Sequence, residues 1–193
     1  MSSTTKLLKQ YIEEVVSCPE GHKRLWVFDF DDTLCRTDSK IYLVTADGTR
    51  RSLKPGEFAS YVESPGERFD YSEFLSLINP RPIKWVNRVL RAVYDHHGGA
   101  NITVLSARGF PGPIHEYLDI HGMPDVEVVT LGSSANETAD VKAEWVTRRI
   151  EQGGYDSVVF LDDSVRNVEA AGRLERVRAL RVIHNRIGES LRG

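Results

Sequence analysis

The sequence has few cysteines, no long apolar run and little net charge, and each absence excludes a class of protein. Its two cysteines, Cys18 and Cys35, are too few for a disulfide framework and lack the spacing of metal ligands. A formal charge of −3 over 193 residues gives no general attraction to nucleic acid or to an anionic membrane. The N-terminal stretch "MSSTTKLLKQYIEEVV" carries Lys and Glu where a signal peptide has an uninterrupted apolar segment. We therefore expect a cytoplasmic protein without a membrane partner.

Short apolar runs alternate with helix-like segments along most of the chain, which is long enough for one domain over residues 1–193. The runs show little polar alternation, as is typical of strands covered on both faces of a parallel sheet. The alternation predicts an α/β fold with a doubly wound, mostly parallel, Rossmann-like sheet. Strands are expected at Leu25–Phe30, Asn101–Leu105, Val126–Thr130, Ser157–Leu161 and Val177–Ile183. Helices are expected at Ile83–His96, Gly112–His121, Glu137–Gln152 and Val165–Ala171.

Residues 34–80 interrupt this alternation. The segment Lys40–Leu53 reads as a hairpin, because Asp47-Gly48 suits the positive φ of a tight turn. Two short helical pieces, Gly56–Val62 and Tyr71–Ile78, are expected before the break at Asn79-Pro80. This insertion is too small for an independent domain, and we expect it to form a small cap or flap over the end of the first strand.

Three aspartates, Asp29, Asp31 and Asp32, stand within four positions in "RLWVFDFDDTLCRTD", at the end of the first apolar run. Alternate strand residues share a face, so Asp29 and Asp31 would point to the same side unless the chain already turns at Asp31. Two carboxylates about 4 Å apart repel by roughly 4 kcal/mol at a near-surface effective dielectric. A bound divalent cation removes that cost, and ligands that are all oxygen favour Mg²⁺. The alternative is a run of exposed turn aspartates.

A second acidic pair, Asp162 and Asp163, follows another predicted strand in "VVFLDDSVRNV". Because ligands of such sheets bind beyond the carboxyl ends of the strands, this pair could complete a metal site with the first cluster. The alternative is that Asp162, Asp163 and Ser164 form only the N-cap of the next helix.

Two further residues stand where phosphate chemistry would use them. Ser106 ends a predicted strand in "ITVLSARG", and its hydroxyl, nearby backbone N–H groups and Arg108 are able to bind phosphate oxygens. Lys142 lies in a predicted helix in "ADVKAEWV", where a lysine is ordinarily a solvated surface residue. Either residue taken alone is more often structural than functional.

The order of these pieces resembles the haloacid dehalogenase-like (HAD) phosphohydrolase superfamily, from roughly Arg24 to Ile183. The shared order is an Asp-x-Asp-x-Thr strand end, a strand ending in Ser, a helical Lys and a strand ending in Asp-Asp. Asp32 stands where Gly is frequent in that superfamily. The short insertion, "SAR", "DVKAE" and "DD" are similar to the phosphatase half of phage polynucleotide kinase-phosphatases. The sequence contains no Gly-x-x-x-x-Gly-Lys-Ser/Thr loop of a kinase half.

The resemblance implies roles for the acidic residues. Asp29 would be the nucleophile that forms an aspartyl-phosphate, and Asp31 would be the general acid and base. Thr33 would help to fix the first loop. Magnesium would be held by the Asp29 carboxylate, the backbone carbonyl of Asp31 and Asp163, with Asp162 as a support or second ligand.

The resemblance also implies a phosphate site. Ser106, with Ala107 and Arg108 beside it, would bind the transferring phosphoryl group. Lys142 would neutralise the charges of the phosphoryl group and of Asp29. A dianionic substrate needs Mg²⁺ and Lys142 to offset its repulsion by several carboxylates.

The substrate is expected to be a phosphomonoester, because Asp31 supplies the carboxylate that simple phosphatases of this superfamily carry. With only one short insertion the site would stay open, which favours a large substrate such as a nucleic-acid 3′-phosphate end, with nucleotides also considered. Basic residues of the insertion and beside Ser106 could contact a phosphate backbone or could simply be solvated: Arg36, Arg50, Arg51, Lys54 and Arg108. The alternatives are a phosphoprotein or small-metabolite phosphatase, and a non-catalytic module that binds metal or phosphate. The sequence does not indicate an oligomeric state.

Overall fold

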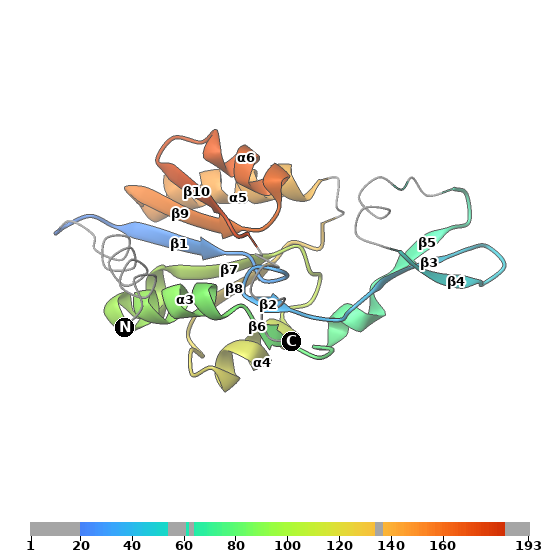
Figure 1. The fold of residues 1–193 in the computed structure, drawn as a ribbon. Helices are drawn as coiled ribbons and strands as arrows, with labels where there is room; N and C mark the ends of the chain where they lie inside the picture. Colours follow the sequence, from blue (N-terminus) through green and yellow to red (C-terminus); the bar gives the residue numbers. More distant parts are fainter. Residues whose placement is uncertain (1–19, 54–60, 62–63, 134–136, 184–193) are drawn as a thin grey trace.

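A five-stranded parallel sheet forms the centre of the molecule (Figure 1). The computed structural model describes residues 20–53, 61, 64–133 and 137–183. The strand order is β10-β9-β1-β7-β8, and every neighbouring pair is parallel. The strands are β1 (Arg24–Phe28), β7 (Ile102–Ser106), β8 (Glu127–Thr130), β9 (Ser157–Asp162) and β10 (Val177–Arg181).

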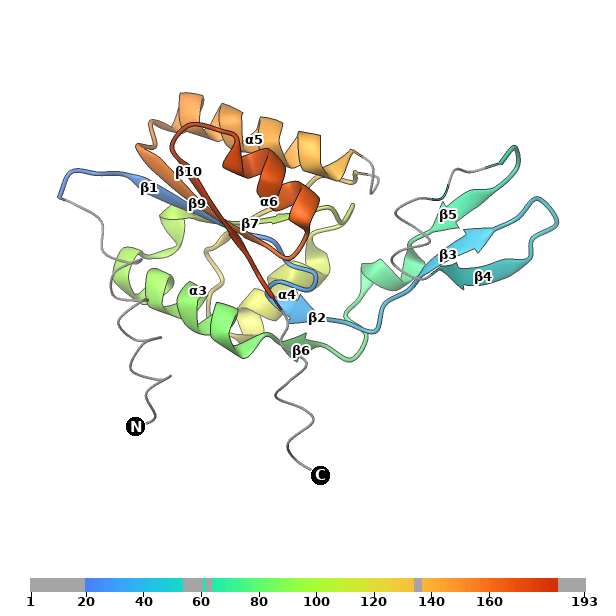
Figure 2. The same ribbon diagram turned by 45° about the horizontal axis from the view of Figure 1, so that its top comes forward.

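Helices cover both faces of this sheet (Figures 1 and 2). In β1, Trp26 and Phe28 pack into one apolar cluster, and Leu25 and Val27 into the other, because successive strand residues face opposite sides. The first cluster includes residues of α3 (Lys84–His97) and α4 (Gly112–Ile120). The second includes residues of α5 (Thr138–Gly153) and α6 (Val165–Gly172). This arrangement confirms the predicted α/β fold with a parallel sheet wound on both sides.

The predicted strands and helices of the core are all present, with small shifts at their ends. Strand β1 stops at Phe28 rather than at Phe30. The chain turns there because the Phe30 carbonyl accepts the backbone N–H groups of Thr33, Leu34 and Cys35. Helices α3 and α5 are followed by the C-cap residues Gly98 and Gly154, whose φ angles of 69° and 62° suit glycine. A short 3-10 helix, η2 (Gly99–Asn101), leads into β7. No described helix has the length and apolar character needed to cross a membrane.

The insertion, residues 34–80, is called the flap below. Strand β2 (Cys35–Arg36) pairs antiparallel with β6 (Arg81–Pro82), so the chain leaves and re-enters the core at neighbouring points. Beyond this pair, β3 (Ile41–Val44) lies between β4 (Arg50–Leu53) and β5 (Arg68–Asp70) in an antiparallel sheet. This small sheet projects away from the parallel sheet (Figures 1 and 2).

The predicted hairpin is confirmed as β3 and β4, and Gly48 in its turn has a φ of 85°. The structure differs from expectation in the rest of the flap. The segment expected to be helical at Tyr71–Ile78 forms only one turn of 3-10 helix, η1 (Ser72–Leu75), and strand β5 precedes it. The other piece, Gly56–Val62, lies outside the described residues except for Tyr61.

Candidate active site

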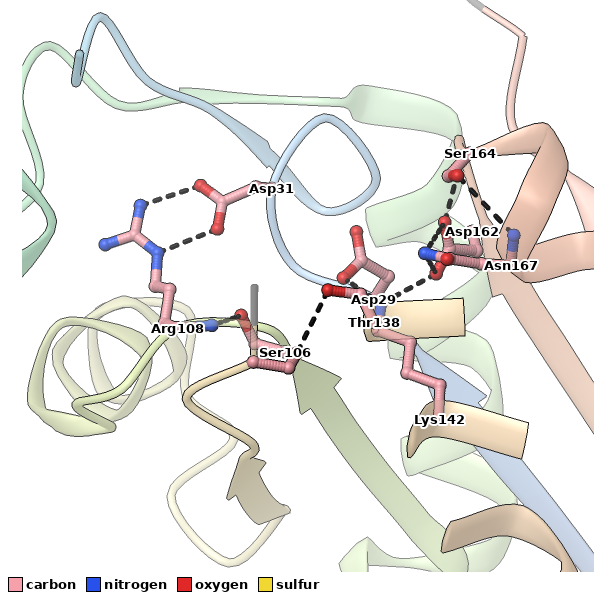
Figure 3. A network of polar contacts seen from close by, with 10 residues as sticks. Asp29, Asp31, Ser106, Arg108, Thr138, Lys142, Asp162, Ser164 and Asn167 are labelled. Carbon is pink, nitrogen blue, oxygen red and sulfur yellow. Dashed lines mark hydrogen bonds and ion pairs between the residues drawn. The ribbon is translucent and has the colours of Figure 1, made fainter. Parts of the chain in front are cut away.

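A buried lysine joins two strands at the carboxyl edge of the sheet. Lys142 Nζ donates to Asp29 Oδ1 and to Asp162 Oδ2, each at 2.7 Å (Figure 3). Asp29 follows β1 and Asp162 ends β9, and these two strands are neighbours in the sheet. The Lys142 side chain is only 2% exposed, so this lysine belongs to the interior rather than to a solvated helix face.

Three carboxylates gather here against one ammonium group. Asp29, Asp162 and Asp163 each place one oxygen within 4.8 Å of the others. Burial raises the pKa of Asp29 well above its usual value, against the effect of Lys142, and Asp162 and Asp163 add to the rise. Burial would lower the pKa of Lys142, but Asp29 and Asp162 together raise it. The three carboxylates therefore share the single positive charge of Lys142.

Asp162 is fully occupied by protein donors. Its Oδ1 accepts from the backbone N–H of Ser164 at 2.9 Å and from the Asn167 amide at 3.0 Å. Its Oδ2 accepts from Lys142 and again from Asn167 at 3.0 Å. Ser164 also caps α6, so the predicted N-cap and the predicted acidic cluster occur together. A carboxylate has about four acceptor positions, so Asp162 has little capacity left for a cation.

Asp163 is the member of the second acidic pair with capacity for a metal. Burial raises its pKa to about 6, and the charges of Asp162 and Asp32 add to this rise. Burial disfavours the ionised form of this carboxylate, and a cation bound beside it would stabilise that form. The donor set of the cluster is made of carboxylate oxygens only, the chemistry that Mg²⁺ prefers. The residues present thus fit a hard divalent cation such as the expected Mg²⁺, which Asp29 and Asp163 would hold.

The loop after β1 is held tightly by the backbone. The Asp29 N–H donates to Leu161 in β9 at 2.9 Å, so Asp29 still follows the sheet although the strand has ended. Asp32 has a φ of 56°, in the left-handed region where Gly is easiest and Asp is tolerated. Thr33 is fully buried in the same loop, and its hydroxyl has no hydrogen-bond partner among the residues described.

Asp31 turns away from the lysine cluster. Its carboxylate accepts from Arg108 Nη2 at 2.7 Å and from Nε at 2.8 Å, whereas Asp29 faces Lys142 (Figure 3). The two aspartates therefore face different partners, because the strand ends before them and the loop reverses direction. Arg108 is 1% exposed at its side chain and also donates to the carbonyl of Phe74 in the flap at 3.0 Å.

Two buried residues with hydroxyl groups, Ser106 and Thr138, belong to elements that end or begin at this edge of the sheet. The Ser106 side chain is buried at the end of β7 and accepts from the backbone N–H of Arg108 at 3.2 Å. Thr138 begins α5, one turn before Lys142, and is buried. Its Oγ1 is 3.0 Å from the Ser133 hydroxyl. Thr138 stands four residues before Lys142 and therefore shares its face of the helix. This spacing is a sequence signal that could have identified Thr138.

The structure brings most of the predicted site residues together and separates one group. Asp29, Lys142, Asp162 and Asp163 form one cluster. Asp31 and Arg108 form a second group. The Arg108 guanidinium donates to the Asp31 carboxylate and to a backbone carbonyl of the flap. Ala107 lies between Ser106 and Arg108 on the same turn. Sequence reasoning missed Asn167 as a support for Asp162, and its spacing gave no specific signal.

Comparison of the chain with protein-family models, with curated proteins and with solved structures gives no match.

Proposed function

We propose that the chain is a Mg²⁺-dependent phosphomonoester hydrolase that works through an aspartyl-phosphate on Asp29. The observation that carries this proposal is the position of Lys142, which bridges Asp29 and Asp162 at the carboxyl edge of the sheet. A lysine buried to this extent between carboxylates can neutralise a nucleophilic aspartate and an incoming phosphoryl group together. The order of motifs along the sequence supports the same reaction.

In the first step, an Asp29 oxygen forms a bond to phosphorus while the bond from phosphorus to the leaving oxygen breaks. Lys142 holds Asp29 Oδ1, which leaves the other oxygen to attack. Asp31 delivers a proton to the leaving alcohol. Ser106, with the turn that contains Ala107, binds the oxygens of the transferring group.

In the second step, water attacks phosphorus and the bond from phosphorus to Asp29 breaks. Asp31 accepts the proton of that water, and the products are inorganic phosphate and the free Asp29 carboxylate. Asp29, Asp163 and the Asp31 backbone carbonyl would hold Mg²⁺, and Asp162 would orient Lys142. When bound, the ion supplies positive charge that lets a dianionic ester approach this acidic edge.

We propose nucleic-acid 3′-phosphate ends or nucleotides as the substrate class. The flap leaves the core beside Asp31, and its small sheet carries exposed Arg51, which is suited to a phosphate backbone, whereas the neighbouring Arg50 is paired with Asp70 at 2.9 Å. A phosphoprotein or a small metabolite would use the same catalytic residues, so only a comparison of substrates separates these classes.

The test is phosphate release from a panel of phosphomonoesters, with Mg²⁺ or with EDTA. The panel contains 3′- and 5′-phosphorylated oligonucleotides, nucleoside monophosphates, sugar phosphates and phosphopeptides. We expect release that needs Mg²⁺, is lost in Asp29→Asn and is retained in Asp95→Asn, a matched change at an exposed position of α3. Absence of release from every substrate by a folded protein would contradict the proposal and would favour a non-catalytic binding module.

A further inference from the structure

Arg108 lies at the junction between the first loop and the flap, and among the described residues the hydrogen bonds and ring contacts of its side chain are with these two parts. It donates twice to the Asp31 carboxylate, at 2.7 and 2.8 Å. It donates to the carbonyls of Phe74 at 3.0 Å and Ser76 at 3.5 Å. Its guanidinium also lies over the rings of Phe30 and Phe74, at 5.2 and 4.8 Å from their centres.

The side chain is therefore a rigid link rather than a free phosphate ligand. It is 1% exposed, and a guanidinium with a bidentate carboxylate and a carbonyl partner has few donors left for a substrate. The paired geometry also fixes the plane of the Asp31 carboxylate, because two parallel hydrogen bonds allow little rotation. Phe74 belongs to η1 in the flap, so the position of η1 and the orientation of Asp31 are tied together.

We infer that Arg108 is a positioning residue, which fixes the Asp31 carboxylate for its role as a base and couples that carboxylate to the flap. This inference rests on the proposed function for its catalytic half, whereas the coupling is independent of any reaction. Each Asp31 oxygen has two acceptor positions, and Arg108 uses one on each. The remaining position on either oxygen can take the proton of the attacking water while Arg108 stays in place.

The catalytic half is tested with p-nitrophenyl phosphate, whose leaving group departs without protonation. Its first step does not need Asp31 as an acid, but hydrolysis of the aspartyl-phosphate needs Asp31 as a base. In Arg108→Met we expect a burst of p-nitrophenolate equal to the enzyme concentration, followed by turnover at least about tenfold slower than in the wild type. Arg108→Lys, which keeps the charge without the paired geometry, should recover part of the rate.

The coupling is tested by hydrogen exchange over residues 70–79, measured by mass spectrometry on the unliganded protein. Arg108→Met and Asp31→Asn should both speed exchange in this segment by about tenfold or more, the effect of losing a local anchor. Arg88→Met, which changes an exposed arginine of α3, is the control and should leave the segment unchanged.

The outcomes separate this inference from the proposed function. A wild-type protein without turnover would contradict the proposed function and the catalytic half, while the exchange data would still decide the coupling. Unchanged exchange in both Arg108→Met and Asp31→Asn, with folding confirmed by circular dichroism, would overturn the coupling. Slower turnover without a burst in both Arg108 variants would overturn the role in the second step.

Discussion

Two buried cations organise the candidate site, and they are used differently. Lys142 joins carboxylates that come from neighbouring strands of the sheet, so both of its partners belong to the core. Arg108 joins a carboxylate of the first loop to backbone carbonyls of the flap. Lys142 thus neutralises charge within the core, whereas Arg108 connects the first loop of the core to the inserted flap. Their loss should accordingly affect different properties.

The largest effect is expected for Lys142→Met without metal. The change leaves Asp29 and Asp162 buried without a counter-charge, and removing one partner of a buried ion pair typically costs about 3–5 kcal/mol. Urea unfolding at pH 7 in EDTA measures the loss, with the exposed Lys84→Met as a control. A variant within about 1 kcal/mol of the wild type would show that Lys142 is not an essential counter-ion of the core.

A smaller effect is expected from pH, through Asp163. Its pKa is about 6 in the folded protein and 3.8 when unperturbed, so the folded state keeps a proton that the unfolded state has already lost between these values. Stability without metal should therefore fall as pH rises from about 4 to 6, by roughly 2–3 kcal/mol from this group. Unfolding of the wild type and Asp163→Asn over this range isolates the contribution.

The same unfolding experiment, repeated with Mg²⁺, tests whether Asp163 binds the ion. At pH 7 the ion should raise the unfolding midpoint of the wild type, because it binds the folded state and compensates the carboxylates. Asp163→Asn should lose most of this rise, whereas Asp95→Asn should keep it. Equal stabilisation of all three proteins would place the ion elsewhere.

Arg108→Met is expected to cost less global stability than Lys142→Met. Asp31 is 32% exposed at its side chain, so water can replace the lost donors. We expect a loss of about 1–3 kcal/mol, the range for removing a hydrogen-bond partner of a charged group. Measured beside Lys142→Met in the same urea series, a loss as large as that of the lysine variant would remove the distinction between the two cations.

The smallest effect is expected at the base of the flap. Asp38 accepts from Arg81 and Asn79 in an exposed ion pair, which solvent and salt screen. Asp38→Asn should leave the thermal midpoint and the exchange of residues 70–79 unchanged. A clear change in flap exchange would show that the flap depends on its surface ion pairs as well as on Arg108.

The sequence was informative where a pattern reports burial. The apolar runs located every strand of the parallel sheet, because strands covered on both faces are apolar throughout. Strand β5, "RFD", is only three residues long and has no apolar pattern, so nothing marked it. The bend after Phe28 was also hidden, because it depends on three N–H groups that converge on the Phe30 carbonyl.

In the candidate site, too, some residues could be placed from the sequence and others could not. Residues at the carboxyl ends of β1 and β9 could be placed at one edge of the sheet, since parallel topology determines that edge. The contact between Asp31 and Arg108 joins positions 77 residues apart, and Arg108 also donates to the flap backbone, so no local pattern reports it. Asn167 is similar: its amide reaches both oxygens of Asp162 only because α6 starts where it does.

The pairing of β2 with β6 allows the length of the flap to change without changing the core. Because the chain departs at Cys35–Arg36 and returns at the adjacent Arg81–Pro82, a longer or shorter excursion needs no new path through the sheet. Closing a loop of twice the length adds only about 0.6 kcal/mol of entropy. A longer or shorter flap is therefore compatible with the same acidic edge of the sheet.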